Sequence, residues 1–237
     1  MTGTHGWTLH SWAILLHIIL FVYWLGGDLG VFYSSRFILK PELSTAARGV
    51  AVKIMHVVDM SPRICLVLFL PSGITLMASD DLGRDMFGGR RLAAIWIFAL
   101  VWLWLVIADY RRGPGRFGDA VHRTDLIVRG ALIAVLLGGA AYTFVADEPF
   151  GVTSDPRWLA GKVAAYALCI AGGLAIRVKL KPFGAAWGTL LAKGSSPEVE
   201  RDIRGAVQGS IPYVLAIWVL VVVAALLGVV KPGTTAY

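Results

Sequence analysis

His17 is the residue whose type and position most clearly predict chemistry in this chain, because it lies inside a long apolar segment, residues 9–33. An ionisable side chain in hydrocarbon is costly unless something compensates it, so such a residue is a functional hypothesis by default. Imidazole is also the commonest metal ligand among protein side chains. Helical spacing places Trp24 and Gly27 on the same stripe. We therefore expect a haem-binding helix in which His17 is an axial ligand of the iron.

Trp24 and the adjacent Gly26–Gly27 pair have two interpretations. In the first, Trp24 lies near the macrocycle, and the glycines, which have no side chain, admit either a ring edge or a neighbouring helix. In the second, His17 forms a hydrogen bond to a neighbouring helix, and Trp24 packs in the core. The spacing alone leaves both interpretations open.

The second apolar segment carries His56, Asp59 and Arg63 on one helical face. Asp59 and Arg63 are four residues apart, so they can pair and reduce the cost of their burial. This pair can be purely structural, Arg63 can meet a haem propionate or a quinone, or His56 and Asp59 can relay protons. His17 and His56 differ in depth by roughly 20 Å at 1.5 Å per residue, so they cannot share one iron.

Lys162 opens the fifth apolar segment, one turn before Tyr166. A lysine at this position can simply extend its ammonium group to the membrane surface. It also lies within reach of the half of the membrane that holds His17. We therefore count Lys162 as a candidate cofactor-binding and catalytic residue, with Tyr166 beside it.

The remaining histidines give weaker indications. His122 lies in a basic inner loop and is expected to be solvated, with a second site beside His56 as the alternative. His5 and His10 lie at the outer edge, where they and Met77 could bind copper.

The elements that position these residues are apolar segments. The chain has 237 residues, of which 57% are hydrophobic, and a mean hydropathy of +0.70. Soluble domains contain roughly 45–50% apolar residues. Each segment can cross the ~30 Å hydrocarbon core; they are 11–33, 53–78, 92–110, 126–146, 158–178 and 211–230. Because they use nearly all of the sequence, we expect one all-α, polytopic membrane domain over residues 1–237 with six transmembrane helices.

Charge predicts the orientation of these helices. The loops after segments one, three and five carry fifteen Lys and Arg residues, whereas the opposite side carries six. By the positive-inside rule, both termini face away from the cytoplasm, and we expect a bacterial inner membrane. Residues 1–10 contain no Lys or Arg, so a cleaved signal peptide is not expected. Anionic lipid, not nucleic acid, is the expected counter-charge for the net charge of +7.

Segments three and four contain few polar groups. Trp96, Trp102 and Trp104 lie on an apolar body, which predicts a helix that faces lipid or a partner protein. Segments one, two, five and six are expected to form the core, with three and four appended. Before segment six, Ser196 and Pro197 predict a helix start, and the amphipathic stretch 198–208 is expected to lie along the inner surface.

Four short motifs resemble the HemJ-type protoporphyrinogen oxidases, and the related CopD-type copper-resistance membrane domains share the first of them. They occur in the same order as in that family. They are Leu16-His17 with Trp24, Gly27 and Phe32–Phe37; Met60-Ser61-Pro62; Trp158–Val163; and Val229–Pro232. They cover segments one, two, five and six.

The resemblance implies an integral-membrane four-helix bundle that binds haem b. His17 is similar to the family's haem ligand, and Lys162 is similar to its essential lysine. The family is shorter, so segments three and four look like an inserted hairpin. Asp28, Asp59 and Arg63 do not belong to the family's pattern.

These observations predict a haem-b-binding membrane redox protein, an electron-transfer subunit that serves a partner dehydrogenase or the quinone pool. Its expected cofactor-binding residues are His17, Trp24, Gly27, Arg63 and Lys162, with His17 bound to the iron. The first alternative is a HemJ-like oxidase of protoporphyrinogen IX that uses Lys162 and Tyr166. The second is a CopD-like copper transport protein.

Overall fold

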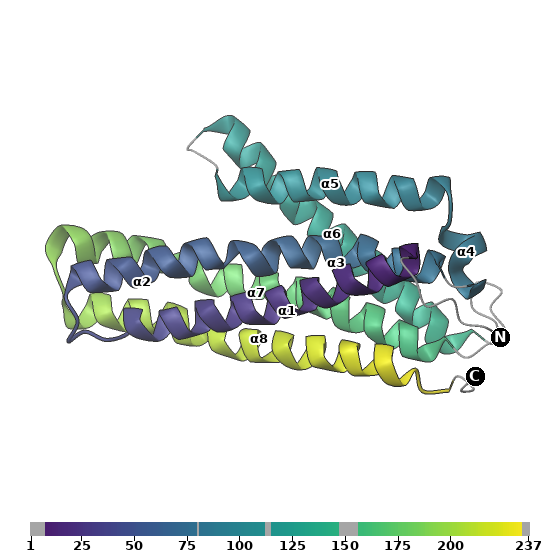
Figure 1. Cartoon of the computed structure of the whole chain (residues 1–237). Helices are drawn as coiled ribbons and strands as arrows, with labels where there is room; N and C mark the ends of the chain where they lie inside the picture. Colours follow the sequence, from purple (N-terminus) through teal and green to yellow (C-terminus); the bar gives the residue numbers. More distant parts are fainter. Residues whose placement is uncertain (1–7, 80, 112–114, 147–155, 234–237) are drawn as a thin grey trace. The chain divides into compact units, whose positions relative to one another are not determined.

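The computed structural model describes residues 8–79, 81–111, 115–146 and 156–233, and every regular element in this part of the chain is a helix (Figure 1). The helices are α1 (Leu9–Ile38), α2 (Thr45–Val58), α3 (Met60–Ala78), α4 (Asp81–Phe87), α5 (Arg90–Tyr110), α6 (Arg116–Val145), α7 (Arg157–Lys193) and α8 (Pro197–Val230). The predicted all-α class is confirmed. Six spans are long and apolar enough to cross a membrane, namely α1, α2 together with α3, α5, α6, α7 and α8.

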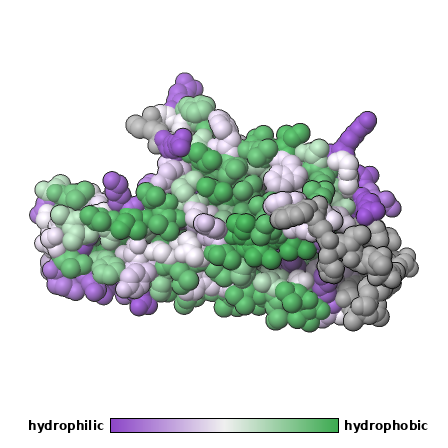
Figure 2. Space-filling model, in the orientation of Figure 1, coloured by the Kyte–Doolittle hydropathy of each residue, from purple (hydrophilic) through white to green (hydrophobic). Residues whose placement is uncertain are grey.

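Large apolar side chains are exposed along these helices, as Figure 2 shows for the visible face. Ile97 on α5 is 63% exposed, and Val219 and Val229 on α8 are 63% and 83% exposed. In water, helices with such surfaces would associate, whereas hydrocarbon accepts them at no cost. By length, composition and surface, the chain is an integral membrane protein in contact with lipid.

The chain divides into two compact units. Unit 1 consists of Met1–Leu29 and Val58–Val128, and unit 2 consists of Gly30–Val57 and Arg129–Tyr237. Unit 1 therefore contains most of α1, all of α3, α4 and α5, and the start of α6. Unit 2 contains the end of α1, nearly all of α2, the rest of α6, and the whole of α7 and α8.

The second apolar segment forms one span, Thr45–Ala78, as the sequence predicts, but its helical hydrogen bonding changes at Asp59. α2 ends at Val58, and α3 begins at Met60. Pro62 has no amide hydrogen, so the carbonyl of Val58 loses its usual helical partner four residues later. The helical hydrogen bonding is therefore locally interrupted one turn before this proline, while Asp59 keeps a right-handed helical backbone conformation. A short helix, α4, lies between α3 and α5.

α7 and α8 pack along each other as an antiparallel hairpin in unit 2. Ser196 caps α8, because its side chain accepts a hydrogen bond from the amide of Val199, and Pro197 occupies the first helical position. This confirms the predicted helix start. With 37 and 34 residues, α7 and α8 are longer than the ~30 Å hydrocarbon core requires.

The expectation of a separate surface helix over 198–208 is wrong, because α8 runs without a break from Pro197 to Val230. Ile203, Ala206 and Val207 are buried within this stretch. These side chains recur at helical spacing on one face, so the buried face of α8 continues from its polar start into its apolar part.

Candidate functional site

His17 is hydrogen-bonded to Ser72 on α3 within unit 1. The distance from His17 Nδ1 to Ser72 Oγ is 2.8 Å. The Ser72 hydroxyl donates its only hydrogen to the carbonyl of Phe69, at 3.1 Å. In this arrangement the Ser72 oxygen accepts the bond from His17 Nδ1, which corresponds to the tautomer with no proton on Nε2. This is the form in which a histidine binds a metal through Nε2.

The His17 ring packs against two aromatic residues of unit 1. Its centroid lies 4.2 Å from that of Phe69, which also contacts Trp24 edge-on at 5.3 Å. Trp24 is only 3% exposed. The second interpretation of this stripe, a histidine bonded to a neighbouring helix beside a core tryptophan, therefore describes the contacts that are observed.

Gly27 faces the start of α3. A methyl group added there would lie 2.7 Å from Pro62 Cδ and 3.1 Å from Ser61 Cβ. The Ser61 hydroxyl donates to the carbonyl of Tyr23 at 3.0 Å and joins the same two helices. Gly27 thus admits a neighbouring helix, whereas Gly26 has no atom within 4 Å of its added methyl position.

Asp59 and Arg63 form the predicted ion pair in unit 1. Arg63 Nε donates to Asp59 Oδ2 at 2.7 Å, and a second guanidinium nitrogen contacts the same oxygen. The two side chains are 31% and 28% exposed, so the pair lies at the surface of the unit. His56 lies on α2 in unit 2 and is exposed, and its proposed role in a proton relay stays a prediction.

Lys162 and Tyr166 lie one turn apart on α7 in unit 2, and both are half-buried. The Lys162 ammonium lies 6.0 Å from the centroid of the Trp158 ring. Lys231, from the end of α8, lies 5.6 Å from the same centroid. The sequence predicted a role for Lys162, but it did not predict that a second lysine shares its aromatic neighbour.

Trp102 is buried, although its apolar neighbours in the sequence predict a side chain that faces lipid. It is 1% exposed, and its indole nitrogen donates to Asp125 Oδ1 on α6 at 3.2 Å. Asp125 has no exposed surface. Trp104, on the same helix, is 56% exposed, as the prediction for a lipid-facing tryptophan requires. α5 and α6 are therefore joined by a polar contact that was not expected from the sequence.

His122 is partly solvated, and it also makes a contact that the sequence did not predict. Its Nδ1 lies 3.0 Å from Asp109 Oδ1, and the side chains of His122 and Asp109 are 33% and 8% exposed. This contact joins α5 to α6 one turn of α6 away from the contact between Trp102 and Asp125. The available signal was the presence of Asp109 and Asp125 at the edges of otherwise apolar segments.

Unit 2 contains a buried arginine that the sequence analysis counted only as an inner-loop charge. Arg48 is 1% exposed and binds Glu200 through two hydrogen bonds of 2.7 and 2.9 Å. Its Nε donates to the carbonyl of Ile38 at the end of α1, at 2.9 Å. The guanidinium group also lies over the Trp187 ring at 5.9 Å. One side chain thus connects α1, α2, α7 and α8.

The described residues contain no group of three or more His, Cys, Asp or Glu side chains that could hold a metal ion. His10 Nδ1 is hydrogen-bonded to Ser79 Oγ at 2.7 Å. His5, which the copper hypothesis also needs, lies outside the described residues. A cofactor that needs a single protein donor, as haem iron does when its other axial position is open, is compatible with His17 alone.

Comparisons with models of known protein families, with curated proteins and with solved structures found no match to this chain.

Proposed function

We propose that this chain is a haem-b-binding membrane redox protein, an electron-transfer subunit that exchanges electrons with a dehydrogenase or with the quinone pool. The observation that carries the proposal is the orientation of His17 within an apolar span. Ser72 accepts a hydrogen bond from Nδ1 in the tautomer that can bind iron through Nε2. A ligating histidine usually donates its other ring N–H to such a partner, which fixes the ring and raises the basicity of the ligand.

The donor chemistry at His17 fits a haem, and the neighbouring residues have distinct tasks. When bound, haem b supplies the electron-carrying iron. Ser72 fixes the tautomer of His17, and Phe69 restrains the plane of its ring. Gly27 packs against α3, so its contribution is to the spacing of the two helices that hold the ligand.

His10 provides a matched control because it makes the same kind of contact. Its Nδ1 is bonded to Ser79, whose hydroxyl donates to the carbonyl of Leu76 at 2.8 Å. The difference is that His10 is exposed near the start of α1, whereas His17 is half-buried two turns further along. The proposal therefore assigns the iron to His17 and not to His10.

The test is the visible absorption spectrum of the purified protein, oxidised and reduced. We expect a Soret band in the wild type and in His10→Ala, and its loss in His17→Ala with insertion retained. Ser72→Ala should keep the haem but shift its potential. Full retention of haem in His17→Ala, or a colourless wild type that contains copper, would refute the proposal. Complementation of a strain that lacks protoporphyrinogen oxidase would instead assign the HemJ-like enzymatic alternative.

A further inference from the structure

Two lysines share one tryptophan at the end of unit 2 where α7 begins and α8 ends. The ammonium groups of Lys162 and Lys231 lie 6.0 and 5.6 Å from the centroid of the Trp158 ring. Both distances are within the range of a cation–π interaction. The two ammonium groups therefore lie within 11.6 Å of each other, the sum of these distances. Two ammonium groups around one ring make this end of the unit electropositive, which attracts an anion.

The backbone of α8 is shaped around both lysines. A methyl group added at Gly228 would lie 2.5 Å from Lys162 Nζ and 3.3 Å from its Cε, so the missing side chain leaves room for the lysine. Lys231 has a φ of 44°, and it is the one non-glycine residue with a positive φ in the described chain. Lys231 is the C-cap of α8, and its left-handed conformation ends the helix there and fixes the position of the lysine beside Trp158.

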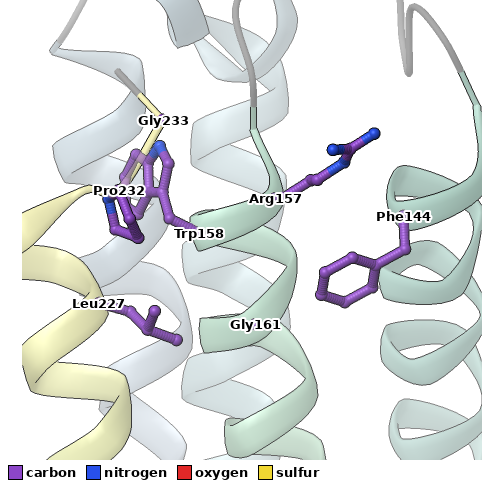
Figure 3. Close-up of a pocket in the computed structure, with 7 residues that line it drawn as sticks. All are labelled: Phe144, Arg157, Trp158, Gly161, Leu227, Pro232 and Gly233. Atoms are coloured by element: carbon purple, nitrogen blue, oxygen red, sulfur yellow. The ribbon is translucent and has the colours of Figure 1, made fainter. Parts of the chain in front are cut away.

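An apolar cavity of about 450 Å³ adjoins the lysines. Its lining comes from α6, α7 and the end of α8, and Figure 3 shows Trp158 and Leu227 on one side of α7 and Arg157 and Phe144 on the other. Leu227 Cδ1 would lie 2.8 Å from a methyl group added at Gly161, so the glycine lets Leu227 pack directly against α7, and the two residues form part of the wall of this groove. The site thus combines cations with an apolar channel on a membrane-spanning hairpin.

We propose that this end of unit 2 binds an anionic phospholipid, with its phosphate between Lys162 and Lys231. The headgroup lies against Trp158, and an acyl chain follows the groove past Gly161, Leu227 and Phe144. Charge complementarity favours an anionic headgroup over choline, which would add a third cation beside the two lysines. The apolar lining favours a lipid over a free phosphate or carboxylate, since a small anion would leave the groove unfilled.

The experiment measures lipid binding to the full-length chain in non-ionic detergent by native mass spectrometry. The probes are phosphatidylglycerol, phosphatidylcholine with the same acyl chains, and glycerol phosphate. We expect phosphatidylglycerol to bind most tightly. The double variant Lys162→Met/Lys231→Met should weaken its binding about 10–30-fold, and Lys231→Arg should largely preserve it. Trp158→Phe should bind better than Trp158→Ala, because a phenyl ring keeps the aromatic face.

The matched control is Lys40→Met/Lys181→Met, which removes the same charge from unit 2. Lys40 also lies over an aromatic ring, that of Phe37, at 5.1 Å. The variant Lys40→Met/Lys181→Met should change the affinity for phosphatidylglycerol by less than about twofold. An unchanged affinity in Lys162→Met/Lys231→Met, or equal binding of the two lipids, would overturn the proposal. Equal binding of glycerol phosphate would assign a free anion in place of the lipid. The presence or absence of haem does not enter this measurement, so it is independent of the proposed redox function.

Discussion

The two units hold their helices together in different ways. In unit 2, Arg48 is 1% exposed and forms a two-pronged ion pair with Glu200. In unit 1, Asp125 has no exposed surface, and its Oδ1 accepts a hydrogen bond from the indole nitrogen of Trp102 at 3.2 Å. Both units therefore contain a buried charged side chain. The one in unit 2 meets a carboxylate through two bonds in a fixed planar geometry, and the one in unit 1 accepts a hydrogen bond from an indole.

The two contacts differ because they join segments at very different separations along the chain. Arg48 and Glu200 are 152 residues apart, so their ion pair fixes segments that no local pattern brings together. Trp102 and Asp125 are 23 residues apart, on two helices joined by a short connection. A planar guanidinium matches a carboxylate at two points, which adds specificity of geometry as well as energy. An indole N–H makes one bond, which suffices for helices that the chain already holds close.

Breaking the contact in unit 2 should have the largest effect on stability. Glu200→Ala leaves the Arg48 guanidinium buried without its counter-charge, and removal of one partner from a buried pair costs ~3–5 kcal/mol. We expect a loss of this size in the free energy of unfolding in detergent. Arg201→Ala is the control, because Arg201 is 75% exposed and its contact with Asp202 measures 4.0 Å. A loss in Glu200→Ala no larger than in Arg201→Ala would show that burial of Arg48 does not matter.

The hydrogen bond in unit 1 should contribute less. Trp102→Phe removes the donor to Asp125, and a lost partner of a buried polar group costs ~1–3 kcal/mol. Thermal unfolding in detergent should show this destabilisation. Trp104→Phe is the control on the same helix, since Trp104 is 56% exposed, and it should be nearly neutral. If Trp102→Phe destabilised the protein as much as Glu200→Ala does, the contrast between the two units would disappear.

The sequence predicts the parts of this fold that depend on local patterns. Six apolar spans, the cap at Ser196 and the pairing of Asp59 with Arg63 all follow from residues within one or two helical turns of each other. The hydrogen bond of His17 to another helix was also one of the two interpretations of its segment, although the partner, Ser72, was not identified.

The missed features depend on contacts between distant segments. Nothing near Arg48 in the sequence indicates Glu200, so a buried guanidinium was indistinguishable from an ordinary inner-loop charge. Trp102 and Trp104 have equally apolar neighbours, and only the packing of α5 decides which of them is buried. The extra length of α7 was missed for a different reason. Hydropathy identifies only the part of a helix that lies in hydrocarbon, whereas Ala186 and Leu190 continue the buried face of α7 beyond it.

Breaking the ion pair between Asp59 and Arg63 in unit 1 should have the smallest effect on stability. It tests whether the large effect expected in unit 2 comes from the ion pair itself or from its burial. Asp59 and Arg63 have the same chemical groups as Glu200 and Arg48, and Arg63 Nε lies 2.7 Å from Asp59 Oδ2, the distance that also separates Arg48 Nη1 from Glu200 Oε1. They differ in exposure, because about 30% of each side chain can be reached by water or lipid headgroups. Pairs of this kind contribute ~0–1 kcal/mol, since each charge keeps part of its solvation when the other is removed.

We therefore expect Asp59→Asn to reduce the free energy of unfolding by less than about 1 kcal/mol. The double variant Asp59→Asn/Arg63→Gln should lie close to the sum of the two single variants. A coupling energy above about 2 kcal/mol in this cycle would mean that a half-exposed pair is as strong as the buried pair of unit 2. A normal stability with an altered haem potential or altered quinone reduction in Arg63→Gln would instead assign Arg63 to the redox site, as the sequence analysis proposed.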